Sequence, residues 1–349
     1  MQTQSPIVFR CMEVNSSPRN LTAVRKLLAD SHLEMDGDIT TFVEARLGNC
    51  VVGCAGLAGN VIKCVAVAPQ FRGKNLSAQL LTEVENVAVA RGHLHLFLYT
   101  KPCNRERFEH SGFWPIVQSA NDTILMENIP SGIQRYCRRL QAYRVPGKRI
   151  GAIVMNANPF TLGHRHLVEL AAKSCDWLHL FVVREDASFF PFSTRLNMVN
   201  MGVSDLANVT VHQGSQYIIS RATFPTYFLK DSGKVQQAWS ETDLLIFRNY
   251  IVPALGITHR FIGSEPFCDV THQYNQTMHQ VLADAVEVVE IPRIKVADKA
   301  ISASEVRRLL KTDQFSRIRK IVPDTTFTCL ESDYARKSQK NQEYHYENC

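Results

Sequence analysis

Short hydrophobic runs alternate with longer helical patterns along the second half of the chain. The runs are rich in Ile, Val, Leu and Phe, which is typical of strands buried on both faces of a sheet. They predict strands at residues 150–155, 177–183, 209–212, 259–262 and 286–291. Because helix-length segments separate these strands, we expect an α/β domain with a doubly wound parallel sheet over residues 148–330.

The first half of the chain has a different pattern, in which strand-like and helix-like stretches follow one another at short intervals. Strands are predicted at residues 40–47, 51–58, 61–69 and 93–99, and helices at 77–91 and around 105–110. This pattern favours a separate mixed α/β domain over residues 1–128. An Ile-Pro-Ser-Gly break and a basic helical stretch then predict a linker at 129–147, and the polar residues 331–349 predict a disordered tail.

Length and composition agree with two domains and narrow the class of protein. The chain has 349 residues, 45% of them hydrophobic, which is enough to bury two cores. Its net charge of +6 is spread along the sequence, and this favours anionic small molecules or an acidic carrier protein as partners rather than nucleic acid. The ten cysteines show no paired C-x-x-C spacing and are interpreted as reduced thiols.

The sequence also bears on localisation. No hydrophobic run approaches the roughly 20 residues that a membrane span needs, and the N-terminus lacks the pattern of a signal peptide. We therefore expect a cytoplasmic protein without a membrane partner.

The stretch at residues 156–164 is the most informative part of the sequence. It reads Asn-Ala-Asn-Pro-Phe-Thr-Leu-Gly-His and joins the predicted strand at 150–155 to a predicted helix. The N-terminus of a helix carries unpaired N–H groups and a partial positive charge, so it can hold phosphate oxygens. Thr161 and His164 are expected to face the same site and to stabilise charge at phosphorus. The alternative is a capped helix with an incidental histidine.

A second motif, Ile-Ser-Ala-Ser-Glu-Val-Arg at residues 301–307, opens another predicted helix. Ser302 and Glu305 are spaced as a capping box. Capping does not account for Ser304 and Arg307, whose hydroxyl and guanidinium are suited to holding the phosphates of a triphosphate. This motif therefore favours the phosphate-site interpretation of the first one.

In order and spacing, the two motifs resemble the T/H-x-G-H and I-S-x-S-x-x-R motifs of the nucleotidyltransferase superfamily. The resemblance implies a Rossmann-like domain that binds ATP with Mg²⁺. It implies that Thr161, His164 and Arg307 are catalytic and that Ser302 and Ser304 hold the β and γ phosphates. No protein ligands for a metal ion are predicted.

Further candidates for ATP binding lie at the same edge of the predicted sheet. They are Asn156, Asn158, Phe160, Gly163, Arg184, Arg195, Gly263 and Glu265. For Arg184 and Arg195, a salt bridge with Glu185 or Asp186 is an equal alternative.

The first domain has a signature of its own at residues 70–75, where Gln-Phe-Arg-Gly-Lys-Asn separates a predicted strand from a helix. A turn with Arg72, Gly73 and Lys74 at a helix N-terminus offers N–H groups to a pyrophosphate. With the surrounding elements, residues 5–128 resemble the GNAT acetyltransferase fold. Asn75 stands where the family pattern has a small residue. We therefore expect this domain to hold a coenzyme A-like arm rather than to transfer acetyl groups from coenzyme A.

A GNAT-like domain followed by this nucleotidyltransferase-like domain resembles the citrate lyase ligase family. The resemblance implies that ATP and acetate are used to acetylate the thiol of the phosphoribosyl-dephospho-coenzyme A group on the acyl carrier subunit of citrate lyase. Acetyl-adenylate would be the intermediate, and AMP and pyrophosphate would be released. The alternative enzyme is a nucleotidyltransferase that leaves AMP on a phosphopantetheine-like acceptor. A carrier-binding module without activity is disfavoured because both motifs are intact.

Overall fold

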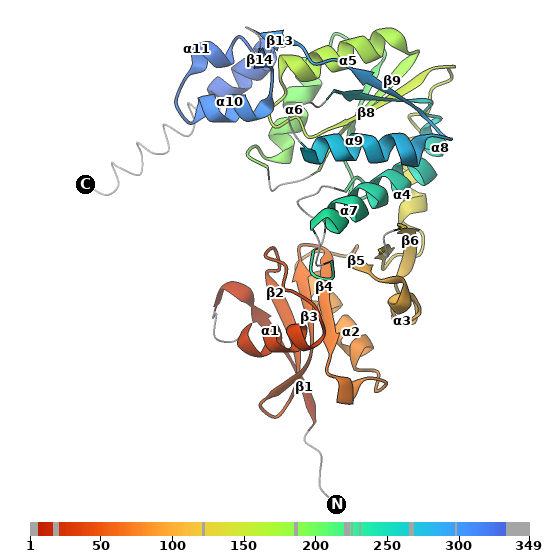
Figure 1. Ribbon diagram of the computed structural model, residues 1–349, viewed down its shortest axis with the longest axis vertical. Helices are drawn as coiled ribbons and strands as arrows, with labels where there is room; N and C mark the ends of the chain where they lie inside the picture. The colour runs from red at the N-terminus through yellow and green to blue at the C-terminus, as the bar shows by residue number, and fades with distance from the viewer. Residues whose placement is uncertain are drawn as a thin grey trace, which may run out of the picture. The chain divides into compact units, whose positions relative to one another are not determined.

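The computed structural model describes residues 6–16, 21–120, 123–184, 188–219, 224, 226–229, 232–264, 269–296 and 299–332. It divides the chain into two compact units (Figure 1). The first unit comprises Met1–Tyr136 together with Thr223–Ile246, and the second comprises Cys137–Ala222 together with Phe247–Cys349.

The first unit is built on a seven-stranded sheet in the order β1-β2-β3-β4-β5-β7-β6. Neighbouring strands are antiparallel except β4 and β5, which run parallel. The strands are β1 (Ile7–Glu13), β2 (Thr41–Leu47), β3 (Cys50–Ala58), β4 (Val61–Val67), β5 (Phe97–Thr100), β6 (Trp114–Gln118) and β7 (Ile124–Glu127). This is the mixed α/β arrangement that the sequence predicts.

Helices α1 (Leu21–Asp30), α2 (Leu76–Ala90) and α3 (Arg105–Glu109) accompany this sheet. Helix α2 buries Leu80, Leu81 and Val84 in a core that also contains residues of β2, β3, β4 and β5. These three residues lie on one face because their spacing of one, three and four positions matches the helical repeat. Short turns η1 (Val14–Ser16), η3 (Pro69–Phe71) and η4 (Pro102–Asn104) connect the elements.

The strand predicted at 93–99 begins only at Phe97. Before Phe97, side chains bond to backbone groups that would otherwise pair with a neighbouring strand. Asn60 donates to the His95 carbonyl at 3.0 Å, and the Leu96 N–H donates to Asn128 Oδ1 at 2.8 Å. A period-two pattern in the sequence does not reveal this competition from side chains.

Helix α7 (Ser232–Ile246) belongs to the first unit, although it follows β10 of the second unit in the sequence. Residues 223–246 lie inside the stretch 148–330 that the sequence assigns to one domain. The helix α4 (Gly132–Gln141) spans the point at which the chain first leaves the first unit. The chain therefore crosses between the two units more than once.

The second unit contains a five-stranded sheet in the order β10-β9-β8-β11-β12, and its neighbouring strands are all parallel. The strands are β8 (Ile150–Met155), β9 (Trp177–Val182), β10 (Val209–Gln213), β11 (His259–Gly263) and β12 (Glu287–Ile291). The predicted doubly wound parallel sheet is confirmed. A small antiparallel pair, β13 (Lys295–Val296) and β14 (Lys299–Ala300), lies outside it.

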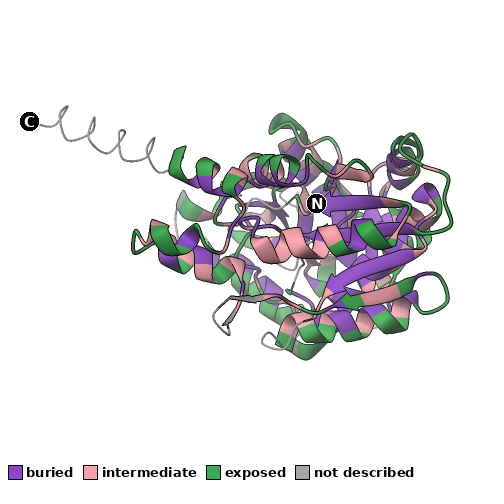
Figure 2. Ribbon diagram, turned by 90° about the horizontal axis from the view of Figure 1, so that it is seen from above, coloured by how far each residue is buried: buried purple, intermediate pink, exposed green. Residues whose placement is uncertain are grey.

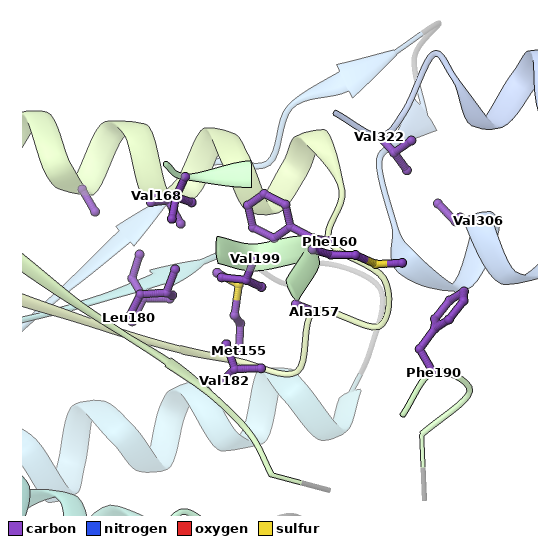
Figure 3. Close-up of a cluster of buried hydrophobic side chains, with 14 of the residues drawn as sticks. Met155, Ala157, Phe160, Val168, Leu180, Val182, Phe190, Val199, Val306 and Val322 are labelled. Atoms are coloured by element: carbon purple, nitrogen blue, oxygen red, sulfur yellow. The ribbon is translucent and has the colours of Figure 1, made fainter. Parts of the chain in front are cut away.

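The second unit contains a short π-helix, η5 (Phe247–Ile251). Its other helices are α5 (Leu162–Ser174), α6 (Phe192–Gly202), α8 (Val252–Leu255), α9 (Asp269–Leu282), α10 (Ala303–Leu310) and α11 (Phe315–Ile318). Buried residues follow the strands, and the helices carry exposed positions as well (Figure 2). Phe160, Val168, Leu180 and Val199 meet in a core that joins the sheet to α5 and α6 (Figure 3). None of the helices in the described residues is long and apolar enough to span a membrane.

Candidate active site

The strand order of the second unit reverses at β8, because the chain adds β9 and β10 on one side of it and β11 and β12 on the other. Ligands of open α/β sheets bind at the carboxyl ends of the strands near such a reversal. The carboxyl end of β8 leads into the turn at 156–160 and then into α5, and β11 ends at Gly263. The first motif, which follows β8, is therefore at the edge of the sheet where a ligand is expected.

Hydrogen bonds from Phe190 and Arg195 hold the turn after β8 in place. Ala157 has a left-handed φ of +48°, and the peptide bond between Asn158 and Pro159 is cis. Asn158 Oδ1 accepts a hydrogen bond from the Phe190 N–H at 3.1 Å. Arg195 Nη1 donates to the carbonyl and to Oδ1 of Asn156, at 2.8 and 2.7 Å. These contacts fix the path of the chain into α5.

Thr161 and His164 form a reciprocal cap at the start of α5. The Thr161 hydroxyl accepts a hydrogen bond from the His164 N–H at 3.4 Å, and His164 Nδ1 accepts one from the Thr161 N–H at 3.0 Å. Because Nδ1 acts as an acceptor, the neutral ring carries its proton on Nε2. The cap thus leaves Nε2–H as the donor that His164 can present to a ligand.

The protonation state of His164 follows from its surroundings. Burial of the ring, together with the positive charge of Arg293, lowers the pKa of His164 to about 4. The imidazole is therefore neutral at pH 7. It can donate a hydrogen bond to a phosphate oxygen without carrying a charge of its own.

The backbone N–H groups at the start of α5 are unequally engaged. The Leu162 N–H donates to the Ile321 carbonyl at 3.0 Å, and the His164 N–H donates to Thr161. The Gly163 N–H between them has no hydrogen-bond acceptor among the residues that the structure describes. This group is consequently available to an oxygen of a ligand.

The second motif meets the first one through Arg307 of α10. Arg307 Nη1 donates to the Asn158 carbonyl at 2.5 Å, although 149 positions separate the two residues. Its Nη2 donates to Ser304 Oγ at 3.0 Å. Partial burial lowers the pKa of Arg307, but a guanidinium stays charged at any physiological pH. A fixed positive charge thus lies beside the turn that leads into α5.

One of the two hydrogen bonds of the predicted capping box is present at the start of α10. Ser302 Oγ accepts a hydrogen bond from the Glu305 N–H at 3.2 Å. The Glu305 carboxylate accepts hydrogen bonds from Arg308, at 2.8 and 2.7 Å. Ser302 is therefore a helix cap, and Ser304 is the hydroxyl that Arg307 contacts directly.

The first unit contains a cavity of about 700 Å³. Arg72 and Gly73 line it, together with Asn75, whose φ is +59°. Lys74 is not among the lining residues, and its Nζ lies 5.3 Å from the centre of the Phe71 ring. Of the three residues predicted to bind a coenzyme A-like arm, the structure brings two to this cavity.

Comparison with known proteins agrees with both units. Residues 150–330 match the family model "Citrate lyase ligase C-terminal domain", and residues 9–113 match that of the "Acetyltransferase (GNAT) family". The chain is 46% identical over 329 residues to the [citrate [pro-3S]-lyase] ligase of Klebsiella pneumoniae, covering 93% of this chain and 96% of that one. It is 44% identical over 323 residues to the enzyme of the same name from Escherichia coli strain K12, covering 91% and 92%.

The chain belongs to the citrate lyase ligase family. It is accordingly a ligase with a GNAT-like first domain and a nucleotidyltransferase-like second domain. The resemblance identified in the sequence is thereby confirmed.

Two residues predicted to contact ATP have buried side chains, so those predictions need correction. The Phe160 side chain is 0% exposed and points into the core beside Val199 (Figure 3). Arg195 is also 0% exposed, and it donates to the carbonyl groups of Phe190, Asn156 and Val183. Both side chains lie in the protein interior beside the turn.

Gly163, Gly263 and Arg184 are further candidates that the structure describes. Gly163 lies near Ile301 of the second motif region, since a Cβ placed on it would lie 3.5 Å from the Ile301 carbonyl oxygen. Gly263 faces open space, and Arg184 is exposed just after β9. Glu265 lies outside the described residues.

Arg293 is a site residue that the sequence interpretation missed. It lies just after β12, where its N–H donates to Ser264 Oγ at 3.3 Å and its Nε donates to the Ser264 carbonyl at 2.8 Å. After burial, the charge of Arg293 is the second cause that lowers the pKa of His164. The sequence contained a sign of this position. Arg293 follows the strand predicted at 286–291, just as Gly263 and Ser264 follow the strand predicted at 259–262.

Proposed function

We propose that this ligase uses ATP and acetate to acetylate the thiol of the prosthetic group on the acyl carrier subunit of citrate lyase, and thereby activates that enzyme. The observation that carries the proposal is the contact of Arg307 with the turn before Thr161 and His164. It brings the two motifs together, which supports a single anion-binding region near the reversal point of the sheet. A chain of the citrate lyase ligase family needs such a region for the phosphates of ATP.

In the first step, an acetate oxygen attacks the α-phosphorus of ATP. The bond from that phosphorus to the oxygen bridging to the β phosphate breaks, and pyrophosphate leaves with the electron pair. Acetate is already ionised at neutral pH, so no protein base is needed. The products of the step are acetyl-adenylate and pyrophosphate.

The residues of the second unit have separate roles in this step. His164 donates its Nε2–H to a non-bridging oxygen of the α phosphate, and Thr161 fixes the ring for that contact. The Gly163 N–H donates to the phosphates as well. Ser302, Ser304 and Arg307 hold the β and γ phosphates and stabilise the charge that develops on pyrophosphate.

The nucleoside part of ATP lies near the carboxyl ends of β11 and β12 in this proposal. Gly263 leaves room for a ribose or a base to approach the backbone. Asn156, Asn158, Arg184 and Glu265 remain candidates for contacts with ATP. ATP enters as its Mg²⁺ complex, and the ion, bound by phosphate oxygens and water, spreads the phosphate charge.

In the second step, the carrier thiol gives its proton to solvent or to a base, and the thiolate attacks the carbonyl carbon of acetyl-adenylate. The carbon–sulfur bond of the thioester forms while the carbon–oxygen bond to AMP breaks, and AMP leaves with the electron pair. Arg72 and Gly73, which line the cavity of the first unit, hold the arm that bears the thiol. We place the reaction in the cytoplasm, where ATP and reduced thiols are available, with neither nucleic acid nor a membrane as partner.

The test is acetylation of purified, deacetylated carrier by the full chain with ATP, Mg²⁺ and labelled acetate. The label on the carrier and free AMP are measured together, with His164→Ala as the control. The expected result is one AMP for each acetyl group, and loss of both in the variant. AMP that stays attached to the acceptor, without acetyl transfer, would establish the alternative nucleotidyltransferase.

A further inference from the structure

The cavity of the first unit opens where β4 and β5 part. The two strands are in register at two positions, Val61 with Phe97 and Ile62 with Leu98, and these are the last pairs found between them in the described residues. Val65 and Val67 of β4 and Thr100 of β5, which come after these pairs, line the cavity. Two parallel strands that separate in this way leave a slot with backbone polar groups on either side.

One wall of the cavity comes from a distant part of the sequence. Tyr227 and Phe228 line it, and they belong to the segment that returns to the first unit between β10 and α7. Their exposed fractions are 8% and 6%. The rest of the lining comes from residues 31–33, 65–77 and 100–108, so this segment is the one contribution from beyond residue 136.

The backbone of this segment is tied to the first unit at several points. The Thr226 N–H and hydroxyl both donate to the Asp36 carboxylate, with the hydroxyl at 2.5 Å. The Glu34 N–H donates to the Tyr227 carbonyl at 2.9 Å. Asp36 in turn pairs with Lys63 at 3.0 Å. Lys63 and Asp36 are 1% and 5% exposed, so this ion pair is buried, and Lys63 also pairs with Asp38 at 2.8 Å.

The side chains are fixed as firmly as the backbone. The Tyr227 hydroxyl donates to the Tyr99 carbonyl of β5 at 2.7 Å. Burial raises the pKa of Tyr227, so the hydroxyl keeps its proton for this bond. Phe224 packs edge-to-face on the Tyr99 ring, with the ring centres 5.0 Å apart. The wall is therefore preorganised before any ligand enters.

The lining of the cavity indicates what it binds. Three exposed cations, Arg72, Lys101 and Arg107, lie along it, and no acidic residue is among its lining residues. The other walls are mainly apolar or neutral. This combination is suited to a ligand with an extended, uncharged chain and phosphate groups at one end.

We propose that Tyr227 and Phe228 are the specificity-determining wall of the carrier-arm site, and that Asp36 is the positioning residue that holds this wall. The side chains of Tyr227 and Phe228 set how far the thiol-bearing arm enters between β4 and β5. The proposal rests on the proposed function, because that function supplies the arm. Free coenzyme A shares the chemistry of the arm, and we assign the site to the arm on the carrier.

The experiment separates the two half-reactions in the full chain. Acetate-dependent exchange of labelled pyrophosphate into ATP measures adenylation without any carrier, and steady-state acetylation gives the KM for the deacetylated carrier. Phe228→Ala is expected to raise the KM for the carrier about tenfold or more, with exchange unchanged within about twofold. The matched control, Leu94→Ala, removes a side chain of the same unit that is 67% exposed, and it should leave both quantities unchanged.

Two milder variants keep the test decisive if Phe228→Ala does not fold. Phe228→Leu keeps a hydrophobic side chain in place and should raise the KM about threefold. Asp36→Asn weakens the Thr226 anchor and should raise the KM for the carrier while the KM for ATP stays constant. Unchanged KM values for the carrier in these folded variants would overturn the proposal.

Free coenzyme A distinguishes the two sources of the arm. It is expected to inhibit carrier acetylation competitively in the wild type, and Phe228→Ala should weaken this inhibition along with carrier binding. Inhibition that the variant leaves unaltered would place coenzyme A elsewhere and contradict the assignment of the wall. Absence of acetate-dependent exchange in the wild type would instead refute the proposed function, and the wall assignment with it.

Discussion

The two candidate sites of this ligase are built in opposite ways. In the second unit, Thr161 and His164 lie within one turn of helix and cap each other, so a short piece of sequence carries most of the local geometry. In the first unit, the cavity is assembled from three separate stretches before residue 136 and from Tyr227 and Phe228. The first kind of site can be recognised from a motif. The second exists only once distant segments have packed.

The two units also differ in how polar groups are kept in place. In the second unit, the proposed phosphate region comprises residues 156–164 and 302–307. Hydrogen bonds within the turn and at the two helix starts hold it, and Arg307 is partly exposed. The wall of the cavity depends on a buried ion pair between Lys63 and Asp36. Substitutions in the phosphate region should therefore act on chemistry, whereas substitutions in the cavity should act on carrier binding.

The largest expected effect is that of His164→Ala. It removes both the Nε2–H donor and the Nδ1 cap, and loss of such a donor costs about 10²–10³ in rate. Acetate-dependent pyrophosphate exchange measures the rate. His164→Asn keeps an acceptor near the Nδ1 position without the Nε2 donor, so it should fold normally and be equally slow. His166→Ala, two positions along the same helix, is the control and should stay near wild type.

Arg307→Ala should have the next largest effect. The variant loses the charge beside Asn158, and the KM for ATP should rise about 10- to 100-fold, in line with a charged hydrogen bond to phosphate. The neighbouring Arg308→Ala breaks an exposed pair with Glu305, which contributes little, and should change the KM by less than about twofold. Equal effects of the two variants would show that the net positive charge of α10, and not the position of Arg307, determines the KM for ATP.

Gly163→Ala and Gly202→Ala separate ligand approach from packing. A Cβ at position 163 would meet its neighbours at 3.5 Å, an ordinary contact, so the variant should fold while exchange falls about tenfold because the methyl group crowds the phosphates. A Cβ at position 202 would lie 2.5 Å from the Phe160 ring. That variant should lose about 1–3 kcal/mol of stability by thermal denaturation. Full activity of Gly163→Ala would remove the Gly163 N–H from the proposed phosphate contacts.

A smaller difference is expected between Arg72→Ala and Lys74→Ala. Arg72 lines the cavity, and its loss should raise the KM for the carrier about three- to tenfold. Lys74 lies over the Phe71 ring and should matter by less than about twofold. Both variants should leave pyrophosphate exchange intact. A larger effect for Lys74 would restore the sequence-based assignment of that residue.

The smallest effect concerns pH. Because the pKa of His164 is about 4, the exchange rate should be flat between about pH 6 and 8. A rate that declined above about pH 6.5 would mean that a charged imidazole is required.

The same shift has a consequence for stability. The unfolded chain takes up a proton on this histidine below about pH 6.5, whereas the folded protein does so only near pH 4. Stability should therefore fall as the pH drops through this window and level off below it. In His164→Asn, chemical denaturation at several pH values should show a smaller fall.

Several features followed from local sequence alone. The strand at 150–155 begins and ends as predicted, and Thr161 and His164, expected on one face from their spacing, lie together at the start of α5. The family resemblance could be recognised from the sequence for the same reason, because each motif is a short stretch with its own hydrogen bonds. Such features depend on neighbours in the chain and on the spacing of hydrophobic residues.

Tertiary structure decided the rest. Phe160 and Arg195 are of residue types that often contact ligands, but the packing of α6 against the turn buries them. Arg293 reaches the site because β12 lies beside β11, and the strand order is not encoded in any single stretch. The segment that contains Tyr227 is bonded to the rest of the first unit through Thr226 and Asp36, which are 190 positions apart. Sequence thus determined the elements, the two motifs and the family, whereas burial, strand order and the cavity wall depended on contacts between residues far apart in the chain.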